Sequence, residues 1–564
     1  MHRNWLVSKT NPDYLNYLSR EASISPVLAQ ILINRDIKDA DAIRDFLSPS
    51  VEMMHDPFLM PDMDRAVERL KKSVEKSETV LVHGDYDADG LTSTAVLVSA
   101  LRMLGMKTFY HIPNRLIEGY GLSMKGIEKA AQLKADLIIT ADCGISSENN
   151  ISKAISMNMD IIVTDHHEVP DILPPATAVI DPHRMDSAYP FKYLAGVGVA
   201  FKLIQALFTE LKVEDSDSRL VSFLDLVALG TIADSVPLIG ENRIIVSHGL
   251  KLINEGGART AIKAMKEVAG VDREFLARTL SFTLIPRINA AGRLQDASEV
   301  VELFLTEDIR EAKRIALLLD EQNRKRKEIE GHVFKEAMEM IDPDNVNSAI
   351  VLSSPEWHPG VIGIVASRLV EIFYKPVFLF SIDGETAKGS ARSIPPFHLF
   401  KAISECSEYL LGYGGHRFAA GLRITTDKLP AFNDMMISKV DDSISPADLV
   451  PVLDIDAAVQ LSDINLSLVK ELILLEPFGN SNREPLFGAR GINIVDHRIV
   501  GNNHLKLKLS QNNYQMDTIG FGMGDELKNI GSSSTLDIAF VPGINEWNGM
   551  RSIQLQLKAL RPGG

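Results

Sequence analysis

Residues 79–90 read Thr79-Val80-Leu81-Val82-His83-Gly84-Asp85-Tyr86-Asp87-Ala88-Asp89-Gly90. The apolar run at the start predicts a buried β-strand, and a histidine and three aspartates follow it directly. Carboxylates this close repel one another, and bound cations relieve that repulsion best. If the segment stays extended, Asp85, Asp87 and Asp89 share one face. The stretch therefore predicts a strand that presents metal ligands beyond its carboxyl end.

The alternation of apolar strands and amphipathic helices continues to residue 163. We expect strands over 79–82, 108–110, 136–139 and 160–163, and helices near 91–104, 123–133 and 147–157. This order is typical of a mainly parallel, doubly wound α/β sheet, in which ligands bind beyond the carboxyl ends of the strands. Asp142 and the run Asp165-His166-His167 follow two of these strands. A single aspartate after a strand is more commonly a turn former or helix cap. Acidic residues that follow three strands at one edge of the sheet favour a ligand-binding site instead.

The chain should contain several domains, because 564 residues exceed the size of one hydrophobic core. We expect an N-terminal helical leader region over 1–75, a catalytic domain over 76–300, a connecting helix over 301–345, a second α/β domain over 346–450 and an OB-like β-barrel over 451–564. The helical periodicity that predicts this connecting helix is seen over residues 298–340. Strict alternation of apolar and polar residues in 504–509 and 552–557 predicts half-buried antiparallel strands. An apolar helix over 220–233 ends at Asp234, a position that is by itself more commonly a cap than a site.

Composition narrows the class of protein. A net charge of −16 argues against a protein that coats nucleic acid through a basic surface, although it does not exclude a nuclease. The two cysteines, Cys143 and Cys406, cannot build a disulfide framework, which favours a reducing compartment. The sequence shows neither a signal peptide nor an apolar run long enough for a membrane span. We therefore expect a cytoplasmic protein that does not associate with membranes.

Five motifs together resemble the DHH phosphoesterase superfamily and, within it, the bacterial exonucleases specific for single-stranded DNA. The motifs are His83-Gly84-Asp85-Tyr86-Asp87-Ala88-Asp89-Gly90, Ala141-Asp142-Cys143-Gly144, Asp165-His166-His167, Gly230-Thr231-Ile232-Ala233-Asp234 and Gly414-Gly415-His416-Arg417-Phe418-Ala419-Ala420-Gly421. An Asp-His-His run alone would be a weak signal, whereas this combination is specific. The resemblance extends over essentially the whole chain.

The resemblance implies two divalent cations that share one carboxylate. His83, Asp87 and Asp142 would bind one ion, and Asp89, Asp142, His166 and Asp234 the other, with Asp142 as the bridge. Carboxylates combined with imidazole suit Mn²⁺, while Mg²⁺ is a possible but weaker fit because it prefers oxygen and water ligands. Two such ions about 3.5–4 Å apart activate a water for in-line attack on phosphorus.

Three neighbouring residues have open roles. His167, Asp142 and Asp85 form the expected catalytic set. His167 either contacts the phosphate and protonates the leaving group, or orients a metal ligand by a hydrogen bond. Asp85 is a ligand, a hydrogen-bond acceptor behind the ligands, or a strand-end cap. Asp165 is expected to support the loop or the imidazoles.

The resemblance also implies residues that hold the DNA strand or its 5′ phosphate. They are Arg115, Arg293, Ser390, Arg392, Gly414, Gly415 and His416. Glycines expose backbone N–H groups to a phosphate, and the planar arginine fork binds a phosphate bidentately. Each arginine alone could equally form a surface ion pair, and a Gly-Gly pair is commonly a turn. Tyr120 and Trp357 either stack on bases or pack, and we expect packing for Trp357.

The expected function is 5′-to-3′ exonucleolytic hydrolysis of single-stranded DNA to mononucleotides, in DNA repair and recombination. We expect a monomer that binds single-stranded DNA. The resemblance further implies single-strand-binding protein and a RecQ-type helicase as partners. One alternative is a phosphodiesterase for nanoRNA or cyclic dinucleotides, which the leader and the region 452–564 argue against. The other is a catalytically silent replication-fork scaffold, which the complete ligand set argues against.

Overall fold

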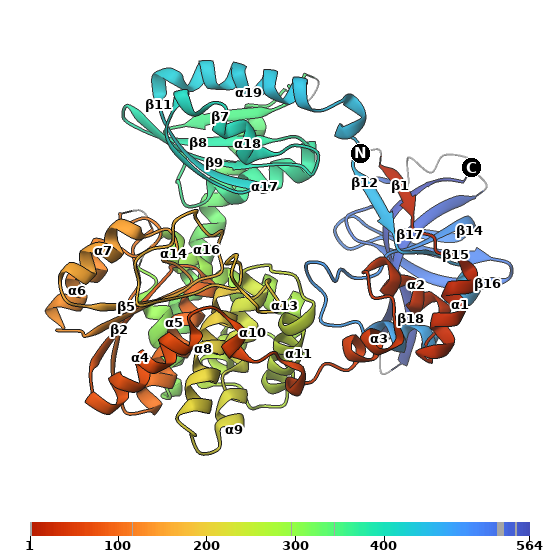
Figure 1. Ribbon diagram of the computed structural model, residues 1–564. Coiled ribbons are helices and arrows are strands. Elements are labelled where there is room, and N and C mark those ends of the chain that lie inside the picture. The colour runs from red at the N-terminus through yellow and green to blue at the C-terminus, as the bar shows by residue number, and fades with distance from the viewer. Residues whose placement is uncertain are drawn as a thin grey trace. The chain divides into compact units, whose positions relative to one another are not determined.

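The computed structural model (Figure 1) describes residues 3–115, 117–294, 296–342, 345–526, 535–547 and 550–563. The chain forms two compact units. The smaller unit contains Met1–Asn4, Pro286–Asp296 and Ala316–Leu453, and the larger one contains Trp5–Ile285, Ala297–Ile315 and Asp454–Gly564. None of the described helices combines the length and apolar character that a membrane crossing requires.

A five-stranded parallel sheet organises the first part of the larger unit. Its strands are β2 (Thr79–Gly84), β3 (Lys107–His111), β4 (Leu137–Ala141), β5 (Asp160–Thr164) and β6 (Ala178–Ile180). Their order is β3-β2-β4-β5-β6, and every neighbouring pair is parallel. The predicted doubly wound sheet is therefore confirmed. The three-residue β6 was not expected, because so short a strand has no readable periodicity.

Helices pack on this sheet from both faces. On one face, α6 (Met124–Gln132) and α7 (Glu148–Ser156) share a core with Leu81, Ile138 and Ile161 of the strands. The other helices of the layered fold are α5 (Ala88–Met103), α8 (Gly196–Glu210) and α10 (Leu224–Ala233). The helix expected over 220–233 is divided, since α9 (Ser216–Val221) ends before α10 begins.

The C-terminal strands close into the predicted OB-type barrel. They are β14 (Phe487–Val500), β15 (His504–Gln511), β16 (Tyr514–Gly520), β17 (Leu536–Trp547) and β18 (Met550–Pro562). The order β14-β15-β16-β18-β17 is closed by pairing of β17 with β14. The alternating segment in β15 is antiparallel to both neighbours, whereas β18 is antiparallel to β17 and parallel to β16.

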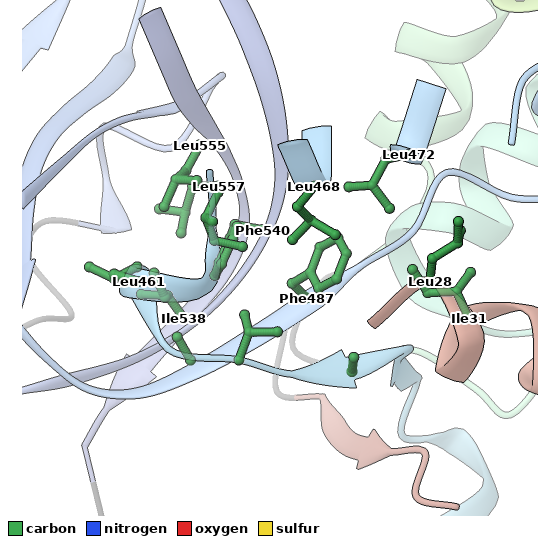
Figure 2. Close-up of a cluster of buried hydrophobic side chains, with 14 of the residues drawn as sticks. Leu28, Ile31, Leu461, Leu468, Leu472, Phe487, Ile538, Phe540, Leu555 and Leu557 are labelled. Atoms are coloured by element: carbon green, nitrogen blue, oxygen red, sulfur yellow. The ribbon is translucent and has the colours of Figure 1, made fainter. Parts of the chain in front are cut away.

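Three of the N-terminal helices share a hydrophobic core with the C-terminal barrel. Leu28 and Ile31 of α2 (Pro26–Asn34) lie in one hydrophobic core with Leu468 of α20 (Leu466–Ile473) and with Phe487 and Phe540 of the barrel (Figure 2). Residues of α1 (Pro12–Glu21) and α3 (Ala40–Leu47) belong to the same core. In contrast, α4 (Met63–Lys76) lies against α8 and β6. Short amphipathic helices need such a partner, because they cannot bury their apolar faces alone.

A mixed five-stranded sheet forms the smaller unit (Figure 1). Its strands are β7 (Ile350–Ser354), β8 (Val377–Asp383), β9 (Thr386–Arg392), β10 (Leu410–Gly415) and β11 (Ala419–Thr425). They are ordered β10-β11-β9-β8-β7, and only β7–β8 is a parallel pair among them. The helices are α17 (Ile362–Phe373), α18 (Leu399–Ser404) and α19 (Leu429–Ser443). Trp357 is buried and donates its Nε1–H to Glu336 Oε2 over 2.9 Å, which confirms the expected packing role.

The helical segment predicted over 298–340 is interrupted. It consists of α15 (Ser298–Leu305) and α16 (Ile309–Glu339). Asp308 lies at the break, where its Oδ1 accepts a hydrogen bond from Arg310 N over 2.9 Å. Aspartate side chains compete in this way with the helical backbone and start a new helix.

The remaining elements are short or connect these domains. They are β1 (Asn4–Val7), α11 (Gly240–Asn254), α12 (Thr260–Val268), α13 (Ala277–Phe282), α14 (Leu284–Leu294), β12 (Val452–Ile455), β13 (Ala457–Ala458) and six 3₁₀ turns at Val51–Met53, Pro57–Leu59, Ser407–Tyr409, Thr426–Lys428, Pro446–Leu449 and Leu461–Asp463.

The shared core gives a prediction for Leu28→Ala. Leu28 is fully buried, so its truncation should destabilise the barrel by about 2–5 kcal/mol. Hydrogen exchange should show faster exchange of amides in β14 and β17. The matched control is Leu6→Ala, because Leu6 is 59% exposed and its truncation should change stability little. Unchanged protection of the barrel strands in Leu28→Ala would contradict the shared core.

Candidate metal centre and phosphate-binding surface

The acidic segment after β2 turns into a helix instead of staying extended. Asp87 caps α5, because its Oδ1 accepts hydrogen bonds from Asp89 N (3.0 Å) and Gly90 N (3.1 Å). The condition under which Asp85, Asp87 and Asp89 would share one face, an extended segment, is therefore not met. A Cβ on Gly90 would lie 2.6 Å from Asp85 Cβ, so glycine lets the turn close over Asp85.

The N-terminus of α8 holds the carboxylate of Asp89. Asp89 Oδ2 accepts from Gly196 N (2.7 Å), and Oδ1 accepts from Val197 N (2.8 Å). Burial raises the pKa of Asp89 to about 7 and the Asp87 charge adds to this, while the two backbone bonds oppose the rise. A Cβ on Gly196 would lie 2.4 Å from Asp142 Oδ1. Sequence reasoning missed this contribution, whose signal is the Gly196-Val197-Gly198 run directly before an apolar helix.

Asp142 and His166 meet at the centre of the site. Asp142 follows β4 with a left-handed backbone (φ 62°), and its Oδ1 lies 3.2 Å from His166 Nε2. The same Nε2 lies 3.8 Å from Asp89 Oδ2 and 3.7 Å from Asp234 Oδ2. The structure thus brings together all four residues expected to bind the second ion.

The potential ligand atoms form three overlapping groups. Within each group they lie within 4.8 Å of one another, and the groups are Asp85–Asp87–Asp142, Asp89–His166–Asp234 and Asp142–His166–His167. Asp142 and His166 each belong to two of these groups.

The donor set fits divalent cations. Among the described residues, the buried atoms Asp85 Oδ1, Asp142 Oδ1 and His166 Nε2 have no hydrogen-bond partner. Burial raises the pKa of Asp85, Asp142 and Asp234, and neighbouring aspartate charges raise them further. Burial lowers the pKa of His166 to about 3, which leaves a neutral imidazole suited to metal binding. Cations at this position would satisfy the orphaned atoms and offset the repulsion.

His83 lies outside these groups among the described residues. Its Nε2 accepts a hydrogen bond from Ser123 N over 3.2 Å, and Gly126 packs so closely that a Cβ there would lie 2.3 Å from His83 Cδ2. The structure places Asp85, and not His83, beside Asp87 and Asp142. Among the described residues, Asp85 therefore completes the group of potential ligand atoms with Asp87 and Asp142.

His167 forms an ion pair at the rim of the centre. Its Nδ1 lies 2.7 Å from Asp165 Oδ1 and 2.9 Å from the Tyr120 hydroxyl. Burial alone would lower the pKa of His167, but the bond to Asp165 and its charge raise it to about 9. Burial would likewise raise the pKa of Asp165, and the bond to His167 instead holds it below its usual value. Asp165 also accepts from Ile145 N, so the expectation that it supports the loop and an imidazole is met.

Asp181 is a buried acid that sequence reasoning missed. It follows β6, and burial raises its pKa to about 8. Its Oδ1 accepts from His183 N over 2.7 Å. No signal in the sequence separates Asp181 from an ordinary turn residue, because β6 is too short to be recognised.

The remaining expected substrate residues divide between the two units. Arg115 lies in the larger unit with its guanidinium 5.2 Å from the Tyr86 ring centroid, while the others lie in the smaller unit. There, Arg392 Nη1 lies 3.2 Å from Ser390 Oγ, and Arg293 Nη1 donates to Gly360 O over 3.1 Å.

The N-terminus of α17 faces Ser390 and Arg392. A Cβ on Gly363, in the first turn of α17, would lie 2.8 Å from Ser390 Oγ and 3.0 Å from Arg392 Nη2. Free N–H groups and the helix dipole make such a terminus attractive to anions, and the arginine adds a full charge. This combination of groups suits a phosphate.

A row of glycines extends this surface across the sheet. Ser390 of β9 pairs with Gly421 of β11, which pairs with Gly414 of β10, and a Cβ on either glycine would meet nothing within 4 Å. Gly415 has a positive φ of 145°, and His416 N donates to Ala419 O over 2.8 Å. Gly414 and Gly421 thus leave this row across β10 and β11 open as far as Ser390 of β9, whereas a Cβ on Gly415 would lie 2.4 Å from Ala419 O.

Comparison with known proteins agrees with this architecture. Residues 79–231 match the DHH family, N-terminal domain; residues 346–442 match the DHHA1 domain; residues 455–559 match the RecJ OB domain. The chain is 36% identical over 560 residues to the single-stranded-DNA-specific exonuclease RecJ of Bacillus subtilis (strain 168), a match that covers 98% of this chain and 70% of that protein. It is 37% identical over 562 residues to the Escherichia coli (strain K12) exonuclease of the same name, with 96% of each chain covered.

Solved structures match the fold over nearly the whole chain. RecJ from Thermus thermophilus in complex with Mn²⁺ superposes with a TM-score of 0.86 at 30% identity, covering 99% of this chain and 79% of that chain. The complex of the same protein with Mg²⁺ gives a TM-score of 0.80 at 29% identity, covering 99% and 78%.

The crowding of buried carboxylates predicts opposite effects of Asp142→Asn on stability and on metal binding. Without metal, the variant should unfold at the same or a higher temperature, because a neutral amide removes repulsion and asparagine tolerates the left-handed backbone. Mn²⁺ at about 100 times its Kd should stabilise the wild-type protein by about 2.7 kcal/mol, and most of this gain should vanish in the variant.

Thermal unfolding and calorimetric titration with Mn²⁺ measure both effects. Asp171→Asn is the matched control, since Asp171 is exposed on the loop after β5. A full Mn²⁺-induced shift in Asp142→Asn would refute the assignment of Asp142 as a ligand.

Proposed function

Because the chain belongs to the RecJ family of DHH-domain proteins, we propose that it hydrolyses single-stranded DNA from the 5′ end and releases mononucleotides. The observation that carries this proposal is the convergence of Asp89, Asp142, His166 and Asp234 on one point, with orphaned buried atoms facing it. The names of the relatives, which are single-stranded-DNA-specific exonucleases, support the substrate class.

We assign two cations to the centre, with Mn²⁺ preferred and Mg²⁺ possible. Asp85, Asp87 and Asp142 would bind one, and Asp89, Asp142, His166 and Asp234 the other. The mixture of carboxylate and imidazole donors favours Mn²⁺, and the Thermus thermophilus relative has been solved with each metal. His83, proposed as a ligand from the family pattern, would have to give up its bond from Ser123 N to bind through Nε2.

The protein side chains have separate tasks in hydrolysis. When bound, the cations lower the pKa of a water and stabilise charge on the scissile phosphate. The contact of His167 Nδ1 with Asp165 Oδ1 orients the ring, which in this proposal protonates the leaving oxygen. The Tyr120 hydroxyl restrains the same ring.

The smaller unit supplies a separate phosphate-binding surface in this proposal. Arg392, Ser390 and the N-terminus of α17 would hold the 5′ phosphate of the strand, with Arg293 beside them. Such a site recognises the strand end and the backbone, and it carries no preference for particular bases. The barrel would bind nucleotides of the strand away from its 5′ end through stacking and charge, as OB folds do.

The two other functions proposed from the sequence are less well supported. A phosphodiesterase for nanoRNA or cyclic dinucleotides does not require the RecJ OB domain that residues 455–559 match. A silent replication-fork scaffold does not require the geometry of a complete acidic centre. The proposed monomeric state, cytoplasmic location, domain boundaries at 75, 300, 345 and 450, and the partners single-strand-binding protein and RecQ-type helicase stay predictions that binding and localisation experiments would test.

The activity proposal predicts which DNA end is attacked. With Mn²⁺, a 5′-labelled single strand should release its label as mononucleotide at once, whereas a 3′-labelled strand should shorten progressively. Duplex DNA should be degraded far more slowly, and an RNA strand measures the sugar preference. Asp142→Ala should abolish release, with Asp171→Asn as the active control. Label released first from 3′ ends, or activity that survives in Asp142→Ala, would refute the mechanism.

Recognition of the strand end predicts a selective effect of Arg392→Lys. Lysine keeps the charge but loses the planar fork, so KM for a 5′-phosphorylated strand should rise about tenfold. KM for a 5′-hydroxyl strand should change little. Arg423→Lys provides the same substitution at an exposed position of the same sheet. Equal effects on both substrates would contradict a 5′-phosphate contact at Arg392.

A further inference from the structure

The segment between β3 and α6 contains a carboxylate with little exposed surface that the metal centre does not use. Glu118 lies in the sequence Arg115-Leu116-Ile117-Glu118-Gly119-Tyr120, and its side chain is only 8% exposed. Two of its neighbours, Arg115 and Tyr120, are exposed. A charged side chain that is buried while its neighbours are exposed indicates a specific bonding role.

Both carboxylate oxygens of Glu118 are bonded. Oε1 accepts from Asn114 N over 3.0 Å and closes the turn that carries Arg115. Oε2 accepts from Ser123 Oγ over 2.7 Å and lies 3.1 Å from His111 Nε2. Burial would raise the pKa of Glu118, but these bonds hold it below its usual value, so the group is an anion. One side chain therefore joins the end of β3, the turn and the start of α6.

The same network reaches the strand that starts the acidic segment. Ser123 N donates to His83 Nε2 over 3.2 Å, and Ser123 Oγ lies 3.3 Å from the same nitrogen. The His83 ring, in turn, packs 5.2 Å from that of His111. The turn is thus fixed relative to the end of β2, two residues before Asp85.

The fixed turn directs two side chains toward the metal centre. The Arg115 guanidinium lies over the ring of Tyr86, the residue that separates Asp85 from Asp87 in the sequence. The Tyr120 hydroxyl lies 2.9 Å from His167 Nδ1. Gly119 and Gly121 have positive φ angles of 82° and 91°, which allow the chain to point Glu118 inward and Tyr120 toward His167.

We propose that Glu118 is a positioning residue. Its hydrogen bonds, which we call the latch, hold the 112–123 turn in place, so that Arg115 can contact the DNA strand and Tyr120 contacts His167. The proposal rests on the proposed function for the role of Arg115, while the latch itself concerns only the fold of the turn. Glu118 acts through these residues and contacts no reacting atom. Because neither Arg115 nor Tyr120 is held in place by burial, loss of the latch should weaken strand binding more than it slows the chemical step.

The test compares Glu118→Gln with Glu128→Gln, a matched change at an exposed position of α6. Glutamine keeps the shape of Glu118, but it is neutral and has one acceptor oxygen, whereas Glu118 accepts from Asn114 N and Ser123 Oγ on two different oxygens. KM for single-stranded DNA should rise about tenfold in Glu118→Gln, with a smaller fall in kcat and an unchanged Mn²⁺-induced thermal shift. Glu128→Gln should behave as wild type.

A double-mutant cycle with Arg115→Ala separates a latch from general destabilisation. If Glu118 acts through Arg115, Glu118→Gln should raise KM far less in the Arg115→Ala background. Additive effects, or an unchanged KM in Glu118→Gln, would overturn the proposal. Ser123→Ala removes one donor and should shift KM in the same direction by less, which provides a second variant if Glu118→Gln folds poorly.

A readout without DNA distinguishes failure of the latch from failure of the proposed function. Trypsin should cleave after Arg115 several-fold faster in metal-loaded Glu118→Gln than in wild type or Glu128→Gln. Equal cleavage rates would refute the latch even if the enzyme degrades DNA as proposed. Faster cleavage in an enzyme inactive on DNA would retain the latch and refute the proposed function instead.

Discussion

Repulsion among buried carboxylates is the constraint on which the rest of the structure depends. Asp85, Asp89 and Asp142 are buried, and Asp234 lies beside them with its side chain 26% exposed. Burial raises the pKa of each of the four, and the charges of neighbouring aspartates raise it further. Such an arrangement destabilises the folded chain unless cations bind to it. The surrounding fold must therefore hold these groups together rigidly, which explains why backbone groups take so large a part in the centre.

Three kinds of backbone contribution hold the acids in place. The ends of parallel strands bring Asp85 and Asp142 to one edge, because β2 and β4 are neighbours in register. The first turn of α5 and the N-terminus of α8 direct N–H groups at Asp87 and Asp89. Glycine at position 196 leaves the space that the Asp142 carboxylate needs. These contributions come from segments far apart in the sequence, so the centre forms only when the whole sheet has folded.

Sequence patterns predicted the sheet, the barrel and most of the acidic centre. The strong signals were apolar runs followed directly by acids or histidines, as at Asp142 and at His166. Elsewhere the prediction of helix boundaries was limited, because aspartate side chains compete with the backbone for hydrogen bonds. Asp87 caps a helix that begins earlier than the expected residue 91, and Asp308 divides a helix that was expected to be continuous. The short strand β6 and the buried Asp181 beside it left no periodic signal at all.

The sequence by itself determined the kind of chemistry, because the residue types and their place after apolar strands are local properties. It also determined the fold class, since periodicity distinguishes parallel strands from the alternating strands of a barrel. Only the tertiary structure decided which acids share a position, as Asp85 lies with Asp142 while His83 is bonded to Ser123. It also decided that α2 belongs to the barrel core and that Glu118 is buried. These outcomes depend on packing between distant segments, and no local pattern records such contacts.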